Sequence, residues 1–410
     1  MTYHIVKHII KIAIRCYYRK IEIRNRHKIP IDTPLLISAN HTNAFMDSLI
    51  LGVFLKQKMT SLPRGDIFFS ASLIKKWFFN KFEMIPVYRA IEGTQYLHKN
   101  KATFIRCHEV LAKKGTIQIF PEAICIQERR MKPMKKGAAR IVLGAEGSHN
   151  FTLGTQLIFV GMNYEKPWKF NSGIFLNYSR PYPISKFINT YKENETAGIN
   201  ELTKFIGEKL KQQMVHINDR SLEHLVEIIE LVYTDHLAQE YGLSVDKMEH
   251  KFLISKEIAN GINYFHAQNP EEIGKLKAIL HHYYEKLKSD GIVDGFIAYP
   301  PFKKEYYLHL LFSTVTFPFY LYGMINNFIP AKITAFSTYK VVKTIEFYSS
   351  VAMVSGIPVF LFFYLLQTLI VGILSHSFVI TIAYVILLPL SGKFVFLYLQ
   401  KWSRINAMRT

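Results

Sequence analysis

The residues best suited to chemistry are His41 and Asp47, which lie six positions apart after the apolar run Leu35–Ile37. A histidine at the end of a strand can meet a carboxylate at the start of the next helix, because the loop between them folds back. A neutral imidazole can take the proton of a hydroxyl as it attacks a thioester, and the carboxylate can orient the ring and stabilise its charged form. The alternative is that Asp47 is a helix cap and His41 an ordinary loop histidine. Taken alone, the pair favours that alternative.

Further charged residues follow at the ends of later apolar runs. Arg89 has the planar, two-pronged donor that suits a phosphate. Glu122 could accept a hydrogen bond from a substrate hydroxyl or hold Arg89 in place. Lys135 and Lys136 precede a predicted helix, whose first amides also favour an anion. Each residue has an alternative as a surface charge or a structural ion pair, but their order along the chain favours a single site.

In this order, the motifs make the chain resemble the PlsC-like glycerophospholipid acyltransferase superfamily over roughly residues 20–185. Four short blocks carry the resemblance: Asn40-His41…Asp47, Val87-Tyr88-Arg89, Phe120-Pro121-Glu122 and Val160-Gly161-Met162-Asn163-Tyr164.

Asn43 and the last of these blocks resemble the branch that contains fungal-type glycerol-3-phosphate and dihydroxyacetone-phosphate acyltransferases. The resemblance implies that His41 is the base, that Asp47 is its partner, and that Arg89 and Glu122 bind the acceptor. We count Asn43 among the substrate-binding residues, together with Lys135 and Lys136.

Two positions depart from the family pattern. Ala123 stands where a glycine usually follows Pro-Glu, and Glu83 replaces a glycine six residues before the motif arginine. If either position needs a positive φ, a side chain there costs on the order of 1 kcal/mol. Neither change removes a chemical group from the expected mechanism.

Strand-like and helix-like segments alternate through the region that holds these motifs. Runs at 35–37, 84–87, 116–120 and 157–160 read as strands, and 47–55 and 95–114 read as helices. This alternation predicts an α/β fold, a PlsC-like acyltransferase domain with a mixed sheet covered by helices, over residues 21–190.

Charge and cysteine content narrow the possible partners. Lysine and arginine number 51 against 31 acidic residues, a formal net charge of +20. This excess implies an anionic partner, and since no nucleic-acid module is recognisable, we expect membrane phospholipids rather than nucleic acid. The three cysteines form no close pair and no Cys/His cluster has zinc-ligand spacing, so we expect neither disulfides nor a metal.

The chain outside the catalytic domain divides into three parts. Residues 1–20 predict a basic amphipathic helix on the membrane surface, with packing on the core as the alternative. Residues 191–300 predict a polar helical extension. Residues 301–410 predict a membrane region, in which 351–374 and 378–399 are long and apolar enough to span a bilayer.

The run 306–328 is a less clear membrane segment, because it contains Pro318 and ends in Asn326 and Asn327. With two spans, the basic segments around 332–343 and 401–409 both lie on the catalytic side, as the positive-inside rule favours. We therefore expect 306–328 to be re-entrant or interfacial. We also expect a cytoplasmic (inner) membrane protein whose catalytic domain faces the cytoplasm.

These expectations combine into a membrane-bound acyltransferase of phospholipid biosynthesis. The acyl donor would be a coenzyme A or acyl carrier protein thioester, and the acceptor a hydroxyl of glycerol 3-phosphate or 1-acylglycerol 3-phosphate. We expect no cofactor and no covalent intermediate. The alternatives are transfer to another lyso- or amino-acid-derived lipid and a non-catalytic, lipid-binding relative.

Overall fold

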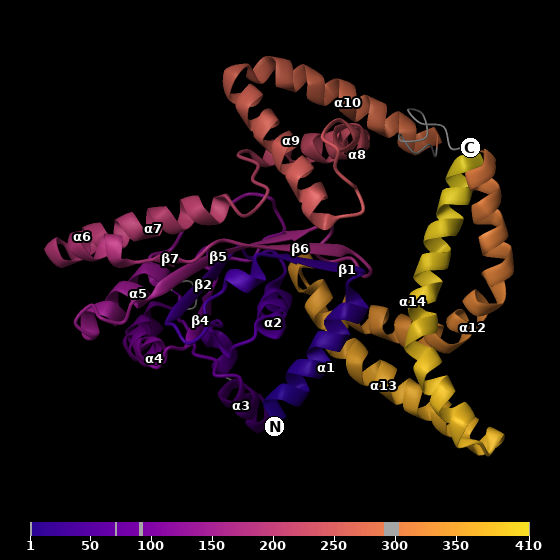
Figure 1. Ribbon diagram of the computed structural model, residues 1–410, viewed down its shortest axis with the longest axis horizontal. Coiled ribbons are helices and arrows are strands. Elements are labelled where there is room, and N and C mark those ends of the chain that lie inside the picture. Colours follow the sequence, from indigo (N-terminus) through magenta and orange to yellow (C-terminus); the bar gives the residue numbers. More distant parts are fainter. Residues whose placement is uncertain (1, 70–71, 90–92, 291–302, 410) are drawn as a thin grey trace. The chain divides into compact units, whose positions relative to one another are not determined.

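The computed structural model describes residues 2–69, 72–89, 93–290 and 303–409. The chain forms two compact units (Figure 1). The first comprises Met1–Pro167, Ser172–Asn218 and Lys247–Phe252, and the second Trp168–Asn171, Asp219–Asp246 and Leu253–Thr410. All of the predicted motifs fall in the first unit.

The first unit is built on a mixed sheet in the order β1-β6-β5-β2-β4-β3, with β7 paired to β5. Neighbours in this order are parallel except β5 and β6, and the β5–β7 pair is antiparallel as well. The strands are β1 (Lys20–Arg24), β2 (Leu35–Ala39), β3 (Met59–Ser61), β4 (Thr116–Ile119), β5 (Gln156–Tyr164), β6 (Gly173–Tyr178) and β7 (Tyr182–Pro183). The expected α/β class with a mixed sheet is confirmed.

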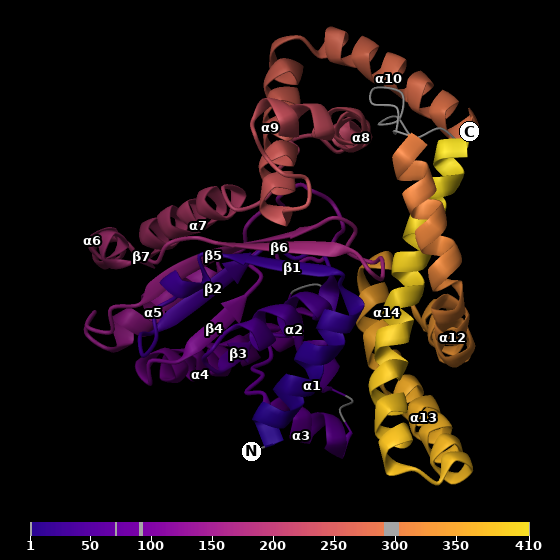
Figure 2. The same cartoon turned by 45° about the vertical axis from the view of Figure 1, so that its right-hand side comes forward.

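Helices cover both faces of this sheet. They are α1 (Thr2–Tyr17), α2 (Ala44–Phe54), α3 (Leu73–Lys81), α4 (Asn100–Ala112), α5 (Gly137–Ser148), α6 (Ile188–Glu193) and α7 (Glu195–Lys211). Helix α7 lies on one face and α2 on the other (Figures 1 and 2). This two-sided cover explains the burial of β2. Its side chains alternate between the two faces of the sheet, and all five residues are buried.

One predicted strand does not form. The segment 84–87 makes only a single bridge, between Val87 and Arg64. Ile85 and Val87 donate their amides to the carbonyls of Ser61 and Pro63, but Pro63 has no N–H to return to Ile85, so the ladder beside β3 is interrupted. The runs at 35–37 and 157–160 are strands as predicted, and the run at 116–120 is a strand as far as Ile119.

The first unit continues past the boundary expected at residue 190. Leu202, Ile206 and Leu210 of α7 are buried in the same core as Leu36 of β2 and Phe159 of β5. An apolar helix face that completes the core of the sheet belongs to that domain. The separate helical region therefore begins near Asp219, and the expected extension's residues 291–300 lie outside the described residues.

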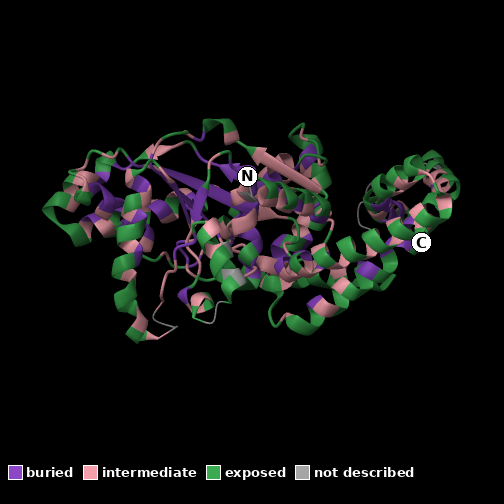
Figure 3. Cartoon of the chain, turned by 90° about the horizontal axis from the view of Figure 1, so that it is seen from below, coloured by how far each residue is buried: buried purple, intermediate pink, exposed green. Residues whose placement is uncertain are grey.

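The second unit is helical. Its helices are α8 (Glu223–Glu240), most of α9 (Met248–Gln268), α10 (Pro270–Asp290), α12 (Lys303–Val341), α13 (Tyr348–Ser375) and α14 (Phe378–Arg409). Three stretches, Lys304–Val341, Ile345–Ser375 and Phe378–Ser403, are long and apolar enough to cross a membrane. Their surfaces are largely exposed (Figure 3), as lipid-facing helices require.

The polar pair that argued against a span in 306–328 has partners within the bundle. Tyr384 donates to Asn326 Oδ1 at 2.5 Å, and Tyr364 donates to Asn327 Oδ1 at 2.6 Å. Gln367 Nε2 donates to the Asn326 carbonyl at 3.0 Å. That carbonyl would otherwise lack a helical donor, because its partner four residues on is Pro330. Residues 306–328 thus lie in one long helix with satisfied amides, while the two-span arrangement stays a prediction.

Candidate active site

The loop after β2 is tied to the neighbouring strand. Asn40 accepts a hydrogen bond from the Met162 amide at 2.7 Å and donates one to the Met162 carbonyl at 3.2 Å. The side-chain amide thereby continues the β2–β5 ladder one step past Ala39, where β2 ends. The next residue, His41, therefore starts from a fixed position at the carboxyl end of the sheet.

His41 and Asp47 meet as the sequence predicts. His41 Nδ1 lies 2.9 Å from Asp47 Oδ2, and the Asp47 side chain is fully buried while that of His41 is 19% exposed. With Nδ1 turned to the carboxylate, Nε2 is the ring nitrogen left to face a substrate. The imidazole also stacks on Phe120, with ring centres 4.0 Å apart and planes 11° from parallel.

Asp47 is not the cap of its helix, contrary to the simpler alternative. The cap position of α2 is Asn43. Asp47 Oδ2 instead accepts the amides of Thr42 and Asn43, at 2.9 and 2.8 Å, so the carboxylate folds the preceding loop back onto the helix. This loop closure is what brings His41 to the carboxylate.

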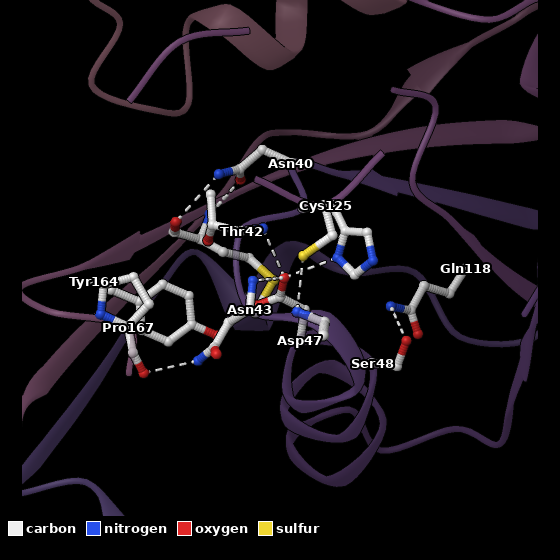
Figure 4. Close-up of polar contacts among 12 residues, drawn as sticks. Asn40, Thr42, Asn43, Asp47, Ser48, Gln118, Cys125, Tyr164 and Pro167 are labelled. Carbon is white, nitrogen blue, oxygen red and sulfur yellow. Dashed lines mark hydrogen bonds and ion pairs between the residues drawn. The ribbon is translucent and has the colours of Figure 1, made fainter. Parts of the chain in front are cut away.

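The second carboxylate oxygen of Asp47 also has a partner. Tyr164, at the end of β5, donates its hydroxyl to Asp47 Oδ1 at 2.5 Å (Figure 4). The Asn43 side chain lies behind the pair and donates to the Tyr18 hydroxyl at 2.8 Å and to the Pro167 carbonyl at 2.9 Å. Asn43 is fully buried. In this structure its bonds to protein groups hold the loop, and its expected part in substrate binding stays a prediction.

Glu122, in the turn after β4, carries a buried oxygen atom that is not hydrogen-bonded. Only 5% of the residue is exposed, and Oε1 has no hydrogen-bond partner among the described residues. Burial raises the pKa of Glu122 to about 7, even though the amides of Lys132 and His41 and the Lys132 charge act in the opposite direction. A substrate hydroxyl could donate to the open oxygen atom, as the sequence predicts.

Arg89 is anchored beside Glu122. Its Nη1 donates to the Ala123 carbonyl at 2.7 Å, which places the guanidinium at the same turn. Ala123 has φ 56° and Glu83 has φ 49°. Both substituted positions therefore do need a positive φ, and each side chain costs on the order of 1 kcal/mol there.

Lys132, which the sequence pattern does not single out, also lies at this turn. Lys132 is only 9% exposed, forms an ion pair with Glu128, and its backbone amide is bonded to Glu122. The side chains of Lys135 and Lys136 are exposed at the start of α5. In the sequence, the hint that Lys132 is paired is its position four residues after Glu128.

Comparison with known proteins finds similarity to acyltransferases over part of the chain. A family model described as Acyltransferase matches residues 20–160. Glycerol-3-phosphate O-acyltransferase 1 of Saccharomyces cerevisiae is 29% identical over 150 residues, 35% of this chain and 20% of that protein. Glycerol-3-phosphate O-acyltransferase 2 of the same yeast is 22% identical over 278 residues, 66% of this chain and 35% of that protein.

A solved structure is also similar. The crystal structure of the 1-acyl-sn-glycerophosphate acyltransferase PlsC from Thermotoga maritima aligns with a TM-score of 0.35 and 17% identity, over 51% of this chain and 78% of that one. The chain spans only 20% and 35% of the length of the two yeast relatives.

Proposed function

Since a family model described as Acyltransferase matches residues 20–160, we propose that this protein transfers a fatty acyl group from an acyl thioester to a hydroxyl of glycerol 3-phosphate or of 1-acylglycerol 3-phosphate. The observation that carries the proposal is the contact between His41 and the buried Asp47, with Nδ1 engaged and Nε2 free to face a substrate. This arrangement suits a general base that acts on an alcohol.

The proposed reaction is direct transfer. His41 Nε2 takes the proton of the acceptor hydroxyl while its oxygen attacks the thioester carbonyl carbon. The tetrahedral intermediate then expels the thiolate, which takes up the proton from the imidazolium, so an ester and a free thiol leave. Asp47 stabilises the imidazolium between these steps through its 2.9 Å contact with Nδ1.

The segment around Glu122 would bind the acceptor. The open oxygen of Glu122 suits a glycerol hydroxyl, and the anchored guanidinium of Arg89 suits the phosphate. Lys132 adds positive charge at the same turn, with the exposed Lys135 and Lys136 further out. The names of the two yeast relatives favour glycerol 3-phosphate as the acceptor.

The reaction would take place at a membrane. In addition to the three long apolar helices, α1 presents Ile5, Ile9 and Ile12 on one side, each about half exposed. These positions recur at helical spacing and lie among basic residues, as expected of a helix that rests in anionic headgroups. We propose, from the basic segments near α12 and α14, that the catalytic unit faces the cytoplasm.

The test is acyl transfer by membranes that contain the wild type, His41→Ala or His224→Ala, an exposed histidine of α8. Glycerol 3-phosphate and 1-acylglycerol 3-phosphate are offered separately, each with a coenzyme A and an acyl carrier protein thioester. We expect His41→Ala to lose at least about 100-fold in rate and His224→Ala to match the wild type. Wild-type membranes inactive with every pair would refute these substrates and direct the search to amino-acid-derived acceptors or to a non-catalytic role.

A further inference from the structure

A small hydrogen-bonded network lies behind the His41–Asp47 pair and is not used in the reaction above. Tyr164 donates to Asp47 Oδ1, the oxygen that does not face the imidazole. Asn43 contributes its backbone amide to the other oxygen and its side chain to Tyr18. The rings of Tyr18 and Tyr164 lie 5.8 Å apart, so the two phenols and the amide form one group.

We propose that Tyr164 is a positioning residue, whose hydroxyl holds the Asp47 carboxylate in the plane that points Oδ2 at His41 and limits the negative charge that His41 experiences. This inference rests on the proposed function. Tyr164 comes from β5, 117 residues after Asp47 in the chain. The late sequence block that ends in Tyr164 thereby acquires a chemical role at the dyad.

The direction of the effect follows from how the carboxylate is bonded. Asp47 accepts two backbone amides and the phenol in addition to the imidazole. Burial and the Asp47 charge raise the pKa of Tyr164, so the phenol keeps its proton and acts as a donor. Each donor disperses the carboxylate charge. Without the phenol, more of that charge acts on His41, which then holds its proton to a higher pH.

The other groups that could titrate around the dyad are few in the described part of the chain. Glu122 and Lys132 come from the segment after β4, and Tyr18 follows α1. Cys125 receives the Ala44 amide at 3.0 Å, at the start of α2. Because Glu122 has a pKa of about 7, a change in an activity profile alone could arise from either carboxyl group. The experiment must therefore observe the His41 ring directly.

The decisive experiment is an NMR titration of full-length protein in detergent, with ¹³C-labelled histidine and the His41 signal assigned by its loss in His41→Ala. Tyr164→Phe is compared with Tyr178→Phe, a buried tyrosine of the adjacent strand β6. We expect Tyr164→Phe to raise the His41 midpoint by about half a pH unit or more. Tyr178→Phe should leave it unchanged.

An unchanged His41 midpoint in folded Tyr164→Phe would overturn the proposal, as would an equal shift in Tyr178→Phe. Folding of each variant is checked by its other histidine signals. A parallel pH–rate profile of the same variants should show the acidic limb moving upward with KM for the acceptor little changed. The titration needs no turnover, so an inactive wild type with a shifted midpoint would reject the proposed substrates and leave the role of Tyr164 standing.

Discussion

Two turns at the carboxyl ends of neighbouring strands differ in whether their buried carboxyl groups are fully hydrogen-bonded. After β2, both oxygens of the buried Asp47 are hydrogen-bonded, and the loop is held by Asn40 and Asn43. After β4, Glu122 keeps a buried oxygen without a partner among the described residues, and Ala123 sits at a strained φ. A group that performs the same proton transfer in each cycle gains from a fixed geometry. A group that binds a substrate must keep a donor or acceptor that is unpaired until the substrate arrives.

Breaking the fixed turn should have the largest effect. Asp47→Asn keeps the shape of the side chain but removes the charge that orients and stabilises His41. We expect the transfer rate to fall by about 10³- to 10⁴-fold, measured in membranes with matched protein levels. Asp66→Asn, at an exposed ion pair with Arg64, serves as the control and should keep the wild-type rate. A rate within tenfold of wild type in Asp47→Asn would mean that the pair is structural.

Changing the open turn should affect substrate binding more than chemistry. Arg89→Lys keeps the charge but cannot both hold the Ala123 carbonyl and present a planar fork to a phosphate. We expect KM for the phosphorylated acceptor to rise about 10- to 100-fold, with kcat changing much less. Arg106→Lys, on the exposed side of α4, is the matched control. An unchanged KM in Arg89→Lys would remove Arg89 from the acceptor site.

Glu122 should make the open turn sensitive to pH. Its pKa is raised from the ordinary 4.5 to about 7 by burial. The folded protein therefore holds this proton more tightly than the unfolded chain, and the resulting stability is present below pH 4.5 and lost as the pH rises through 7. Glu122→Gln cannot ionise, so we expect it to exceed the wild type by about 1–3 kcal/mol at pH 8 and to match it at pH 4. Thermal unfolding at the two pH values measures this, and equal stability at pH 8 would show that the carboxylate is not penalised.

The smallest expected effect concerns the strain in the open turn. Ala123→Gly should stabilise the protein by about 0.5–1 kcal/mol, because glycine adopts φ 56° freely. Ala102→Gly, on the exposed side of α4, should destabilise by a similar amount. The two melting temperatures should therefore move in opposite directions from the wild type. Destabilisation in both variants would indicate that position 123 carries no strain.

The difference between the two turns also explains what the sequence could predict. His41 and Asp47 were found because a short loop joins a strand to a helix, and local spacing reports such contacts. The role of Tyr164 could not be found this way, because its contact with Asp47 depends on the pairing of β2 with β5. β1 was missed because its alternating sequence, Lys20–Arg24, reads as polar until it pairs with β6. In the sequence, Lys132 does not stand out from the nearby lysines, because burial depends on the fold rather than on the charge pattern.

The central claim is that the fixed pair acts as a base in direct transfer, without an acylated protein. Cys125 offers the sharpest alternative, because its thiol accepts the first amide of the helix that carries Asp47. The most direct measurement is the intact mass of the protein after incubation with the active acyl thioester and no acceptor, for the wild type and Cys125→Ser. We expect an unchanged mass in both and acyl transfer by Cys125→Ser at a rate close to that of the wild type. A stoichiometric acyl adduct on the wild type that is absent from Cys125→Ser, together with loss of transfer in that variant, would contradict it.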